Sequence, residues 1–183
     1  MKNAVLWTSV LALCAGAAFA TDDTLFEEVQ PGAYSDMLSQ ATIAYDKHDY
    51  DRAFALNRRT ACGGDKTSQA IVGRMYVLGQ GTPRDEITGY AWIKLAAEFS
   101  YADYTSLARK LEAAMTADQR ARATAQADAM RRKYGLAATG MSCHAESRRG
   151  AYLLDSVVCT PQSTGGGRLE LRRCVDEAGT NQP

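Results

Sequence analysis

Cysteines are the residues of this chain best suited to covalent chemistry. Four of them, Cys62, Cys143, Cys159 and Cys174, lie beyond the N-terminal apolar stretch. In an oxidising compartment such thiols usually pair, and sequence does not choose among the three possible connectivities. We predict a Cys143–Cys159 disulfide closing a short loop, with Cys62–Cys174 tying the C-terminal region to the rest. A metal site would need tighter spacing, such as C-x-x-C, which the sequence lacks.

The two histidines of the chain are candidates for a catalytic base. His48 lies between Asp46 and Asp49 in a predicted turn, where a solvated side chain is the expected outcome. His144 follows Cys143, which suggests a cysteine nucleophile with a base. Adjacent residues on a strand point to opposite faces, so the two side chains would be poorly placed to react together. We therefore predict no catalytic residue, no cofactor and no metal, and regard the protein as not an enzyme.

Glycine and arginine clusters are the remaining candidates for ligand binding. The runs 79–81 and 165–167 lack the lysine and the strand-to-helix context of a phosphate loop. Twenty-one basic residues balance 21 acidic ones, so bulk charge does not favour binding of nucleic acid. Two arginine pairs form a possible partner surface, with a solvated sheet face as the alternative: Arg148, Arg149, Arg172 and Arg173.

The N-terminus is typical of a secretory signal. Lys2 precedes an apolar stretch, residues 4–13, and an A-x-A site ends at Ala20. Lipidation at Cys14 would require a small residue where Leu13 stands. The apolar stretch is shorter than the roughly 20 residues that span a bilayer. We predict cleavage after Ala20, no membrane span, and a periplasmic or secreted protein.

Residues 68–100 predict two helices joined by a glycine-bounded loop. In the first, residues 68–78, Ile71 and Met75 are four apart, as neighbours on one helical face are. Gly73 lies inside this helix, which suggests close approach of another helix. Gly79 ends the helix, and Asp85 is a candidate N-cap for the second.

The second helix is apolar on more than one side, as expected of a helix packed between neighbours. We expect Trp92 to be buried there, and we expect the aromatic residues Tyr76 and Tyr90 to belong to the core instead of lining a groove.

These landmarks resemble the Sel1-like repeat, a relative of the tetratricopeptide repeat. Ser68, Gly89 and Ser100 depart from the family pattern, although all three are small. The resemblance implies an α-solenoid of stacked antiparallel helix pairs. The matching positions are Val72, Gly73, Tyr76, Gly79, Gly81, Asp85, Trp92, Ala96 and Ala97.

Weaker patterns flank this repeat. Residues 34–60 resemble a degenerate hairpin of the same kind, about one repeat length earlier. Residues 101–134 predict a third helix pair, with a capping box at Thr116 and Gln119 and a stop at Gly135. We assign residues 34–135 to the helical region and residues 21–33 to a flexible N-terminal segment.

The C-terminal region favours strands. Residues 152–159 and 168–174 are rich in Val and Leu, a glycine-rich turn separates them, and an earlier short strand would hold Cys143. We predict a two- or three-stranded antiparallel appendage over residues 141–177. Because so small a sheet is marginal alone, it needs a cross-link or a helical surface.

Three functions are compatible with the sequence. The resemblance implies a protein–protein interaction adaptor in the bacterial cell envelope, with a protein partner of unknown identity. The first alternative is a cell-wall- or thiol-directed enzyme, which would need a convergent acid, base and nucleophile. The second is a passive structural or stress-related envelope protein.

Overall fold

The computed structural model describes residues 25–146, 156–163 and 166–175. The predicted signal peptide, residues 1–20, and both Arg148 and Arg149 lie outside the described residues. The helices are α1 Pro31–Asp46, α2 Tyr50–Cys62, α3 Lys66–Leu78, α4 Glu86–Ala96, the 3-10 helix η2 Ala97–Phe99, α5 Ala102–Ala114, α6 Ala117–Tyr134 and α7 Leu136–Thr139. The strands are β1 Phe26–Val29, β2 Ser142–Glu146, β3 Ser156–Thr160 and β4 Leu169–Arg172.

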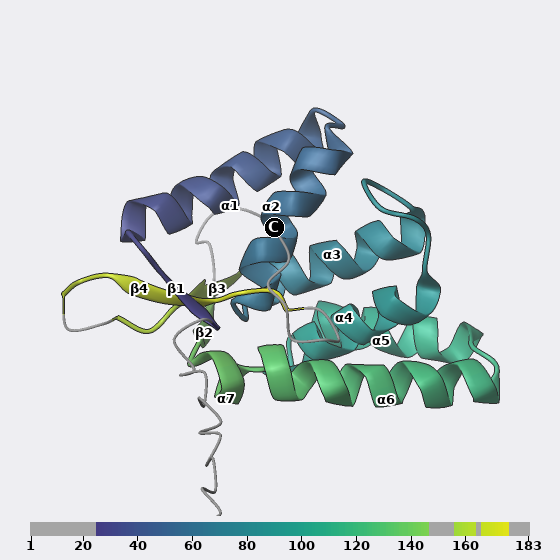
Figure 1. Cartoon of the computed structure of the whole chain (residues 1–183). Coiled ribbons are helices and arrows are strands. Elements are labelled where there is room, and N and C mark those ends of the chain that lie inside the picture. Colours follow the sequence, from purple (N-terminus) through teal and green to yellow (C-terminus); the bar gives the residue numbers. More distant parts are fainter. Residues whose placement is uncertain (1–24, 147–155, 164–165, 176–183) are drawn as a thin grey trace, which may run out of the picture.

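The helices stack in chain order, as the predicted mainly α fold requires. Helix α1 packs on α2, α2 on α3, and α3 on α4, with the strands together at one side of the stack (Figure 1). The third pair differs from the expected hairpin, because α5 and α6 both pack chiefly on α4. Helix α6 achieves this through small side chains, since Ala123 and Ala127 are buried.

Local signals set the ends of the central hairpin. The Asp65 carboxylate accepts a hydrogen bond from the Ser68 amide at 2.7 Å, so α3 begins two residues before the predicted start. Gly79 ends α3 in the left-handed conformation, with φ 69°. The Asp85 carboxylate caps α4 by accepting from the amides of Ile87 and Thr88, each at 3.0 Å. The predicted capping box at Thr116 and Gln119 is also present.

Helices α3 and α4 meet at two glycines. A Cβ atom placed on Gly73 would lie 2.5 Å from Ile93 Cγ1 and 2.7 Å from the Gly89 carbonyl oxygen. A Cβ atom on Gly89 would lie 2.8 Å from the Gly73 carbonyl oxygen. The predicted close approach at Gly73 is confirmed, and Gly89 is the surface that it meets.

This contact predicts that Gly73→Ala destabilises the protein even though alanine favours helix. The added methyl meets backbone that has no room to move, so we expect the free energy of unfolding to fall by about 1–3 kcal/mol in a urea titration. Gly32→Ala in α1 is the matched control, because nothing lies within 4 Å of its Cβ position. The control should leave stability unchanged or raise it by up to about 1 kcal/mol. Equal stability of Gly73→Ala and wild type would contradict the close-approach interpretation.

Trp92 lies in an apolar cluster between successive helices, which we call the second apolar cluster. Its side chain is 5% exposed and its ring stacks on Tyr134, with centroids 5.8 Å apart and planes 16° apart. Val72, Leu95 and the Cys62–Cys174 disulfide complete the surroundings. The predicted burial of Trp92 is confirmed.

Trp92→Ala should therefore remove a large core side chain. We expect the free energy of unfolding to fall by about 3–5 kcal/mol, measured by denaturant titration. Leu78→Ala is the control, because Leu78 is 56% exposed and its truncation should change stability by less than about 0.5 kcal/mol. A loss for Trp92→Ala no larger than the control's would place the indole outside the energetic core.

The strands form two separate two-stranded antiparallel sheets, which corrects the predicted single appendage. β2 pairs with β3, and β4 pairs with β1 near the N-terminus instead of with β3. The expectation of a flexible segment over residues 21–33 was wrong for residues 26–29, which form β1, and α1 already begins at Pro31. The alternation of buried and more exposed residues in β4 explains this pairing. Leu169 and Leu171 of β4 are buried, and Val29 of β1 lies in the same apolar cluster.

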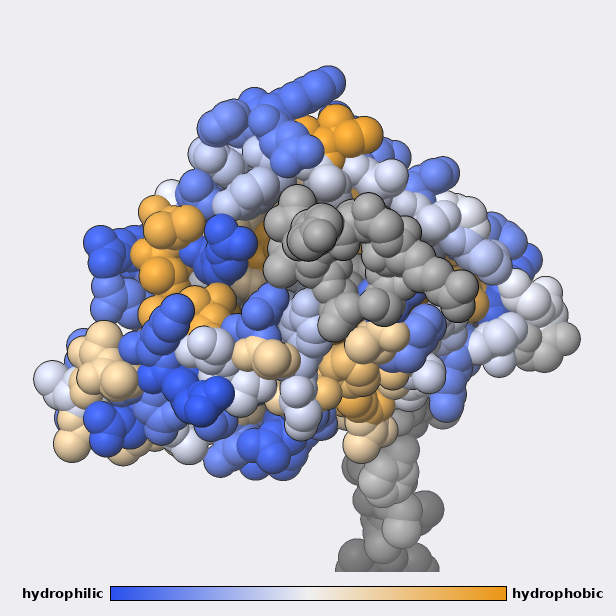
Figure 2. Space-filling model, turned by 180° about the vertical axis from the view of Figure 1, so that it is seen from behind, coloured by the Kyte–Doolittle hydropathy of each residue, from blue (hydrophilic) through white to orange (hydrophobic). Residues whose placement is uncertain are grey.

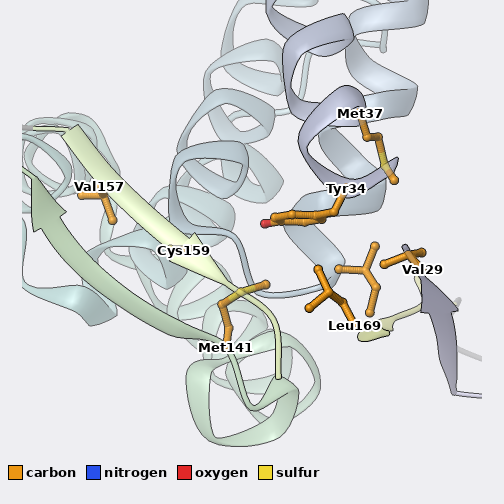
Figure 3. Packing of buried hydrophobic residues seen from close by; sticks show 8 residues of the cluster. Val29, Tyr34, Met37, Met141, Val157, Cys159 and Leu169 are labelled. Carbon is orange, nitrogen blue, oxygen red and sulfur yellow. The ribbon is translucent and has the colours of Figure 1, made fainter. Parts of the chain in front are cut away.

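The first apolar cluster lies where these sheets meet α1. Tyr34 and Met37 extend from α1 toward side chains of the strands (Figure 3). Met141 and Val157 approach from the β2–β3 side, and Leu169 from β4. The small sheets thus obtain the helical surface that the sequence indicated they need.

Both predicted disulfides are present. Cys62 and Cys174 have Cα atoms 5.2 Å apart, and Cys143 and Cys159 have Cα atoms 4.1 Å apart. The first joins the end of α2 to the residues after β4, and the second joins β2 to β3. The C-terminal strands are therefore tied covalently both to the helices and to each other.

Candidate functional site

The most concentrated group of titratable side chains lies at the start of α3. The Lys66 side chain is fully buried, and its Nζ donates to Glu98 Oε2 at 2.8 Å. It also donates to Gln69 Oε1 at 3.1 Å and to the Leu95 carbonyl at 3.3 Å. Three acceptors at these distances satisfy the three N–H groups of the ammonium.

Two partners of Lys66 also form hydrogen bonds with other helices. Gln69 Nε2 donates to the carbonyl oxygens of Ala61 and Tyr134, each at 3.0 Å. Glu98 Oε2 accepts from the Leu136 amide at 3.0 Å. The ends of α2, α4, η2 and α6 and the start of α7 therefore converge on one lysine. We call Lys66, Gln69 and Glu98 the lysine network.

Asp65 adds a buried carboxylate beside the lysine network. Besides capping α3, its Oδ2 accepts from the Tyr34 hydroxyl at 3.2 Å. Burial raises the pKa of Asp65, although hydrogen bonds from Ser68 and Tyr34 oppose the shift. Burial also raises the pKa of Tyr34, and it lowers the pKa of Lys66 against the opposing effect of Glu98.

An acid beside a lysine suggests catalysis, but the geometry favours a structural role. Asp65 is 3% exposed and Lys66 is 0% exposed, so a substrate would not reach either group. Their polar atoms are directed at helix ends, which need such partners when buried. We therefore interpret the lysine network and Asp65 as the joint of the helical stack and not as a reaction centre.

The raised pKa of Asp65 predicts a pH dependence of stability. A carboxyl group whose pKa is higher in the folded state than in the unfolded state stabilises most below the unfolded value, here 3.8, and loses that contribution as pH rises through the folded value. Asp65→Asn removes the titration and keeps an acceptor for Ser68. Relative to the variant, wild type should be less stable at about pH 7 than at about pH 4, as urea titrations at both pH values would measure. A wild-type-to-variant difference that is the same at both pH values would contradict this.

The predicted reactive groups are not brought together. Cys143 is held in its disulfide, and His144 is exposed on β2. His48 is also exposed, with φ 60° in the α1–α2 turn and its ring 5.6 Å from that of Tyr50. Neither histidine is accompanied by a free cysteine, so the structure supplies no thiol nucleophile beside a base in the described part of the chain.

The arginine surface is only partly described. Arg172 donates to the Ala138 carbonyl at 3.4 Å, and its guanidinium lies 5.3 Å from the centre of the Phe26 ring. Arg173 is half-buried, and its amide donates to the Leu25 carbonyl at 2.8 Å. Arg172 is thus engaged in holding β4 against β1 and α7, and a surface shared by all four arginines stays a prediction.

Tyr76, Tyr90 and Trp92 were predicted to belong to the core. Tyr90 is fully buried, and Tyr76 is half-buried with its ring edge-on to Phe54 at 5.3 Å between centroids. Ala96 is also fully buried, while Ala97 begins η2. These repeat landmarks therefore build the interior and leave recognition to other residues.

A hollow between α1 and α3 is the best-formed candidate for recognition. We call it the α1–α3 groove; its volume is about 220 Å³. Residues one turn apart on α1 form one wall, α3 forms the other, and α2 contributes one residue. The lining residues are Ala41, Thr42, Tyr45, Asp46, Asn57, Ile71 and Arg74.

The groove has fixed and free parts. Asn57 is 3% exposed, and its Nδ2 donates to the Ala53 carbonyl at 2.9 Å. The Tyr45 hydroxyl donates to Gln80 Oε1 at 3.0 Å, which links α1 to the loop after α3. Asp46 and Arg74 are exposed, and within the described ranges neither has an ion-pair partner. Two free charges of opposite sign thus flank a rigid, partly apolar hollow.

The α1–α3 groove was not among the features predicted from the sequence. A signal was present, because Ile71, Arg74 and Leu78 fall at positions i, i+3 and i+7, which share one face of α3. Ile71 is partly exposed, Arg74 is exposed and Leu78 is 56% exposed, so this face is not covered by the core. Only the position of α1 beside it turns the face into a groove.

Other parts of the surface are less suited to specific recognition. A wider hollow of about 520 Å³ is lined by Glu98, Arg131 and Ala138 among others, but Arg131 pairs with Asp128 at 2.6 Å. On the face seen in Figure 2, hydrophobic residues occur in separate patches among hydrophilic ones. The α1–α3 groove combines a partly apolar lining with two charged side chains, Asp46 and Arg74, that have no ion-pair partner among the described residues.

In the described ranges, no three or more His, Cys, Asp and Glu side chains are grouped so that they could hold a metal ion. No helix among the described residues is long and apolar enough to cross a membrane.

Comparisons with known proteins give little further guidance. No protein-family model matches the chain. No curated protein matches it either. Among solved structures it is similar to c5321, a protective antigen present in uropathogenic Escherichia coli strains displaying an SLR fold, with a TM-score of 0.46 and 25% sequence identity. The match covers 50% of this chain and 20% of that chain, and at this TM-score the likeness supports no conclusion.

Proposed function

We propose that this protein is a non-catalytic adaptor of the Sel1-like repeat type, which binds an extended segment of another protein in the α1–α3 groove. The observation that carries the proposal is a pair of exposed charges, Asp46 and Arg74, which have no ion-pair partner among the described residues and lie beside a partly apolar hollow. Surface charges without partners retain their capacity for charge-assisted hydrogen bonds to a ligand.

The repeat landmarks support the Sel1-like assignment through their structural roles in the α3–α4 hairpin. Gly73 permits close contact of α3 and α4, and Asp85 caps α4. Gly79 and Gly81 both have positive φ, 69° and 67°, in the loop between these helices. Trp92 and Ala96 are buried. Each landmark thus occupies a position where a different residue type would disturb the hairpin.

The groove indicates what kind of ligand it would accept. Its volume is below the roughly 300–1,000 Å³ usual for small-molecule pockets, so it suits one or two side chains of a larger partner. Arg74 would pair with a carboxylate, for which its planar guanidinium has matching geometry. Asp46 would pair with a basic group of the same segment. The ligand class is therefore an extended peptide segment with an acidic, an apolar and a basic side chain.

The disulfides support an envelope location for this adaptor. Two disulfides in a chain of this size indicate folding in an oxidising compartment, such as the bacterial periplasm or the exterior. A signal peptide cleaved after Ala20 would deliver the chain there. N-terminal sequencing of the exported protein would test that step.

A site-specific cross-linking experiment tests the groove. A photoreactive amino acid at Thr42, which is exposed in the groove, should cross-link the mature protein to one defined envelope protein. The same amino acid at Ala113, exposed on α5, should not. Arg74→Glu should reduce the Thr42 cross-link about tenfold, a change that corresponds to loss of one charge-assisted hydrogen-bonded pair.

Arg109→Glu is the matched control, because it makes the same charge change at an exposed arginine of α5. It should leave the Thr42 cross-link unchanged. Equal loss in both variants would show attraction by overall charge and would contradict groove recognition. Cross-linking from Ala113 but not from Thr42 would place the binding surface elsewhere.

A further inference from the structure

We propose that the Cys143–Cys159 disulfide is a thiol–disulfide exchange site for an external dithiol, with Cys143 as the attacked residue and Cys159 as the leaving thiolate. The proposal is independent of the groove. It rests on the different surroundings of the two cysteines and on one hydrogen bond from α3.

The two cysteines differ in exposure. They lie directly opposite each other on β2 and β3, so the disulfide bridges neighbouring antiparallel strands. Cys143 is partly exposed and packs against the first apolar cluster, whereas Cys159 is 5% exposed and belongs to that cluster. Of the two cysteines, the one on β2 is therefore the more accessible to an incoming thiolate.

The second disulfide is the internal comparison. Cys62 is 1% exposed and Cys174 is 8% exposed, and both belong to the cluster around Trp92. Because exchange requires direct attack on a sulfur atom, access limits its rate. The structure thus provides one reachable disulfide and one protected disulfide in the same molecule.

The start of α3 stabilises the leaving group. The Lys66 amide, the first N–H of the helix, donates to Cys159 Sγ at 3.5 Å. An N–H group at a helix N-terminus favours a thiolate, while burial disfavours it. The charged groups nearest along this helix start are already paired, Asp65 with Tyr34 and the Lys66 ammonium with Glu98. The Lys66 amide is consequently the group that supports a thiolate on Cys159.

The exchange proceeds in two balanced steps. A thiolate of the dithiol attacks Cys143 Sγ, which forms a mixed disulfide, breaks the Cys143–Cys159 bond and leaves its electron pair on Cys159. The second thiol of the reagent, deprotonated, then attacks its own sulfur in the mixed disulfide and releases Cys143 as a thiolate. The two protons lost by the dithiol are taken up by the two cysteines. The protein disulfide is reduced and the dithiol is oxidised.

The helical stack should survive this reaction. Thr67 Oγ1 still donates to the Val157 carbonyl at 3.2 Å, which holds β3 on α3. The Cys62–Cys174 disulfide still ties the C-terminal residues to α2. Reduction therefore alters the connection of β2 to β3 and leaves both core clusters joined to the helices.

The order of reduction tests the proposal on the unmodified protein. The mature protein is treated with dithiothreitol, quenched at intervals with iodoacetamide and mapped by mass spectrometry. Cys143 and Cys159 should become alkylated at least about tenfold faster than Cys62 and Cys174. Equal rates, or faster reduction of the buried pair, would overturn the proposal.

The site of attack is tested with a monothiol. Reduced glutathione forms the mixed disulfide but supplies no second thiol in the same molecule. Acid quenching followed by peptide mapping should find glutathione on Cys143. Glutathione on Cys159 would overturn the assignment of attacked and leaving sulfurs.

A pair of variants isolates the Lys66 amide. Lys66→Pro and Lys66→Met both lose the ammonium, but only proline lacks the N–H. Proline is tolerated at the first helical position, and Asp65, with φ −62° and ψ 117°, is outside the α region that a following proline disfavours. With helical circular dichroism equal in both, exchange in Lys66→Pro should be about two- to tenfold slower than in Lys66→Met. Equal rates would remove the leaving-group part of the proposal.

Discussion

The buried ammonium of Lys66 is the interaction on which the arrangement of the helices depends. A charge without solvent is tolerated only when its partners are in place, and removal of one partner leaves an uncompensated charge. The partners of the Lys66 ammonium come from α3, the end of α4 and η2. Two of these partners, Gln69 and Glu98, also form hydrogen bonds with α2, α6 and α7. A displacement of any one of these elements would break at least one of these hydrogen bonds. The lysine network therefore specifies which helix ends meet, whereas apolar burial alone would allow them to slide.

Small residues, aromatic side chains and disulfides determine how closely the helices and strands pack in this arrangement. Gly73 and Gly89 set the separation of α3 and α4, because side chains there would push the backbones apart. Trp92 and Tyr134 then fill the space that this separation leaves beside α6. The Cys62–Cys174 disulfide attaches the residues after β4 to this stack, and the Cys143–Cys159 disulfide joins β2 to β3. The Gly73–Gly89 contact, the Trp92–Tyr134 stack and the Cys62–Cys174 disulfide thus connect residues that are successively farther apart along the chain.

Features governed by neighbouring residues were predictable from sequence. The cap at Asp85, the capping box at Thr116 and the burial of Trp92 follow from local spacing and from the repeat resemblance, and the structure confirms them. The burial of Lys66 was not predictable, because a lysine in the first turn of a helix usually points to solvent and two of its three partners, the Leu95 carbonyl and Glu98, lie 29 and 32 residues away in the sequence. The pairing of β1 with β4 was missed for the same reason. The α1–α3 groove was not predictable either, because its walls come from two helices of different hairpins and the sequence of one segment does not show how they are placed together.

The pairing of β1 with β4 bears on the order in which the molecule can be assembled. Contacts within each helical hairpin are close in sequence and can form while the chain is still emerging from a ribosome or a translocation pore. Strand β1 is among the first described residues to emerge, but its partner β4 is among the last. Until then, Val29 and the α1 side of the first cluster lack Leu169 and Leu171 of β4. Completion of this cluster is consequently a late, non-local event, and a chain halted before β4 would retain helices while leaving an apolar surface open to chaperones.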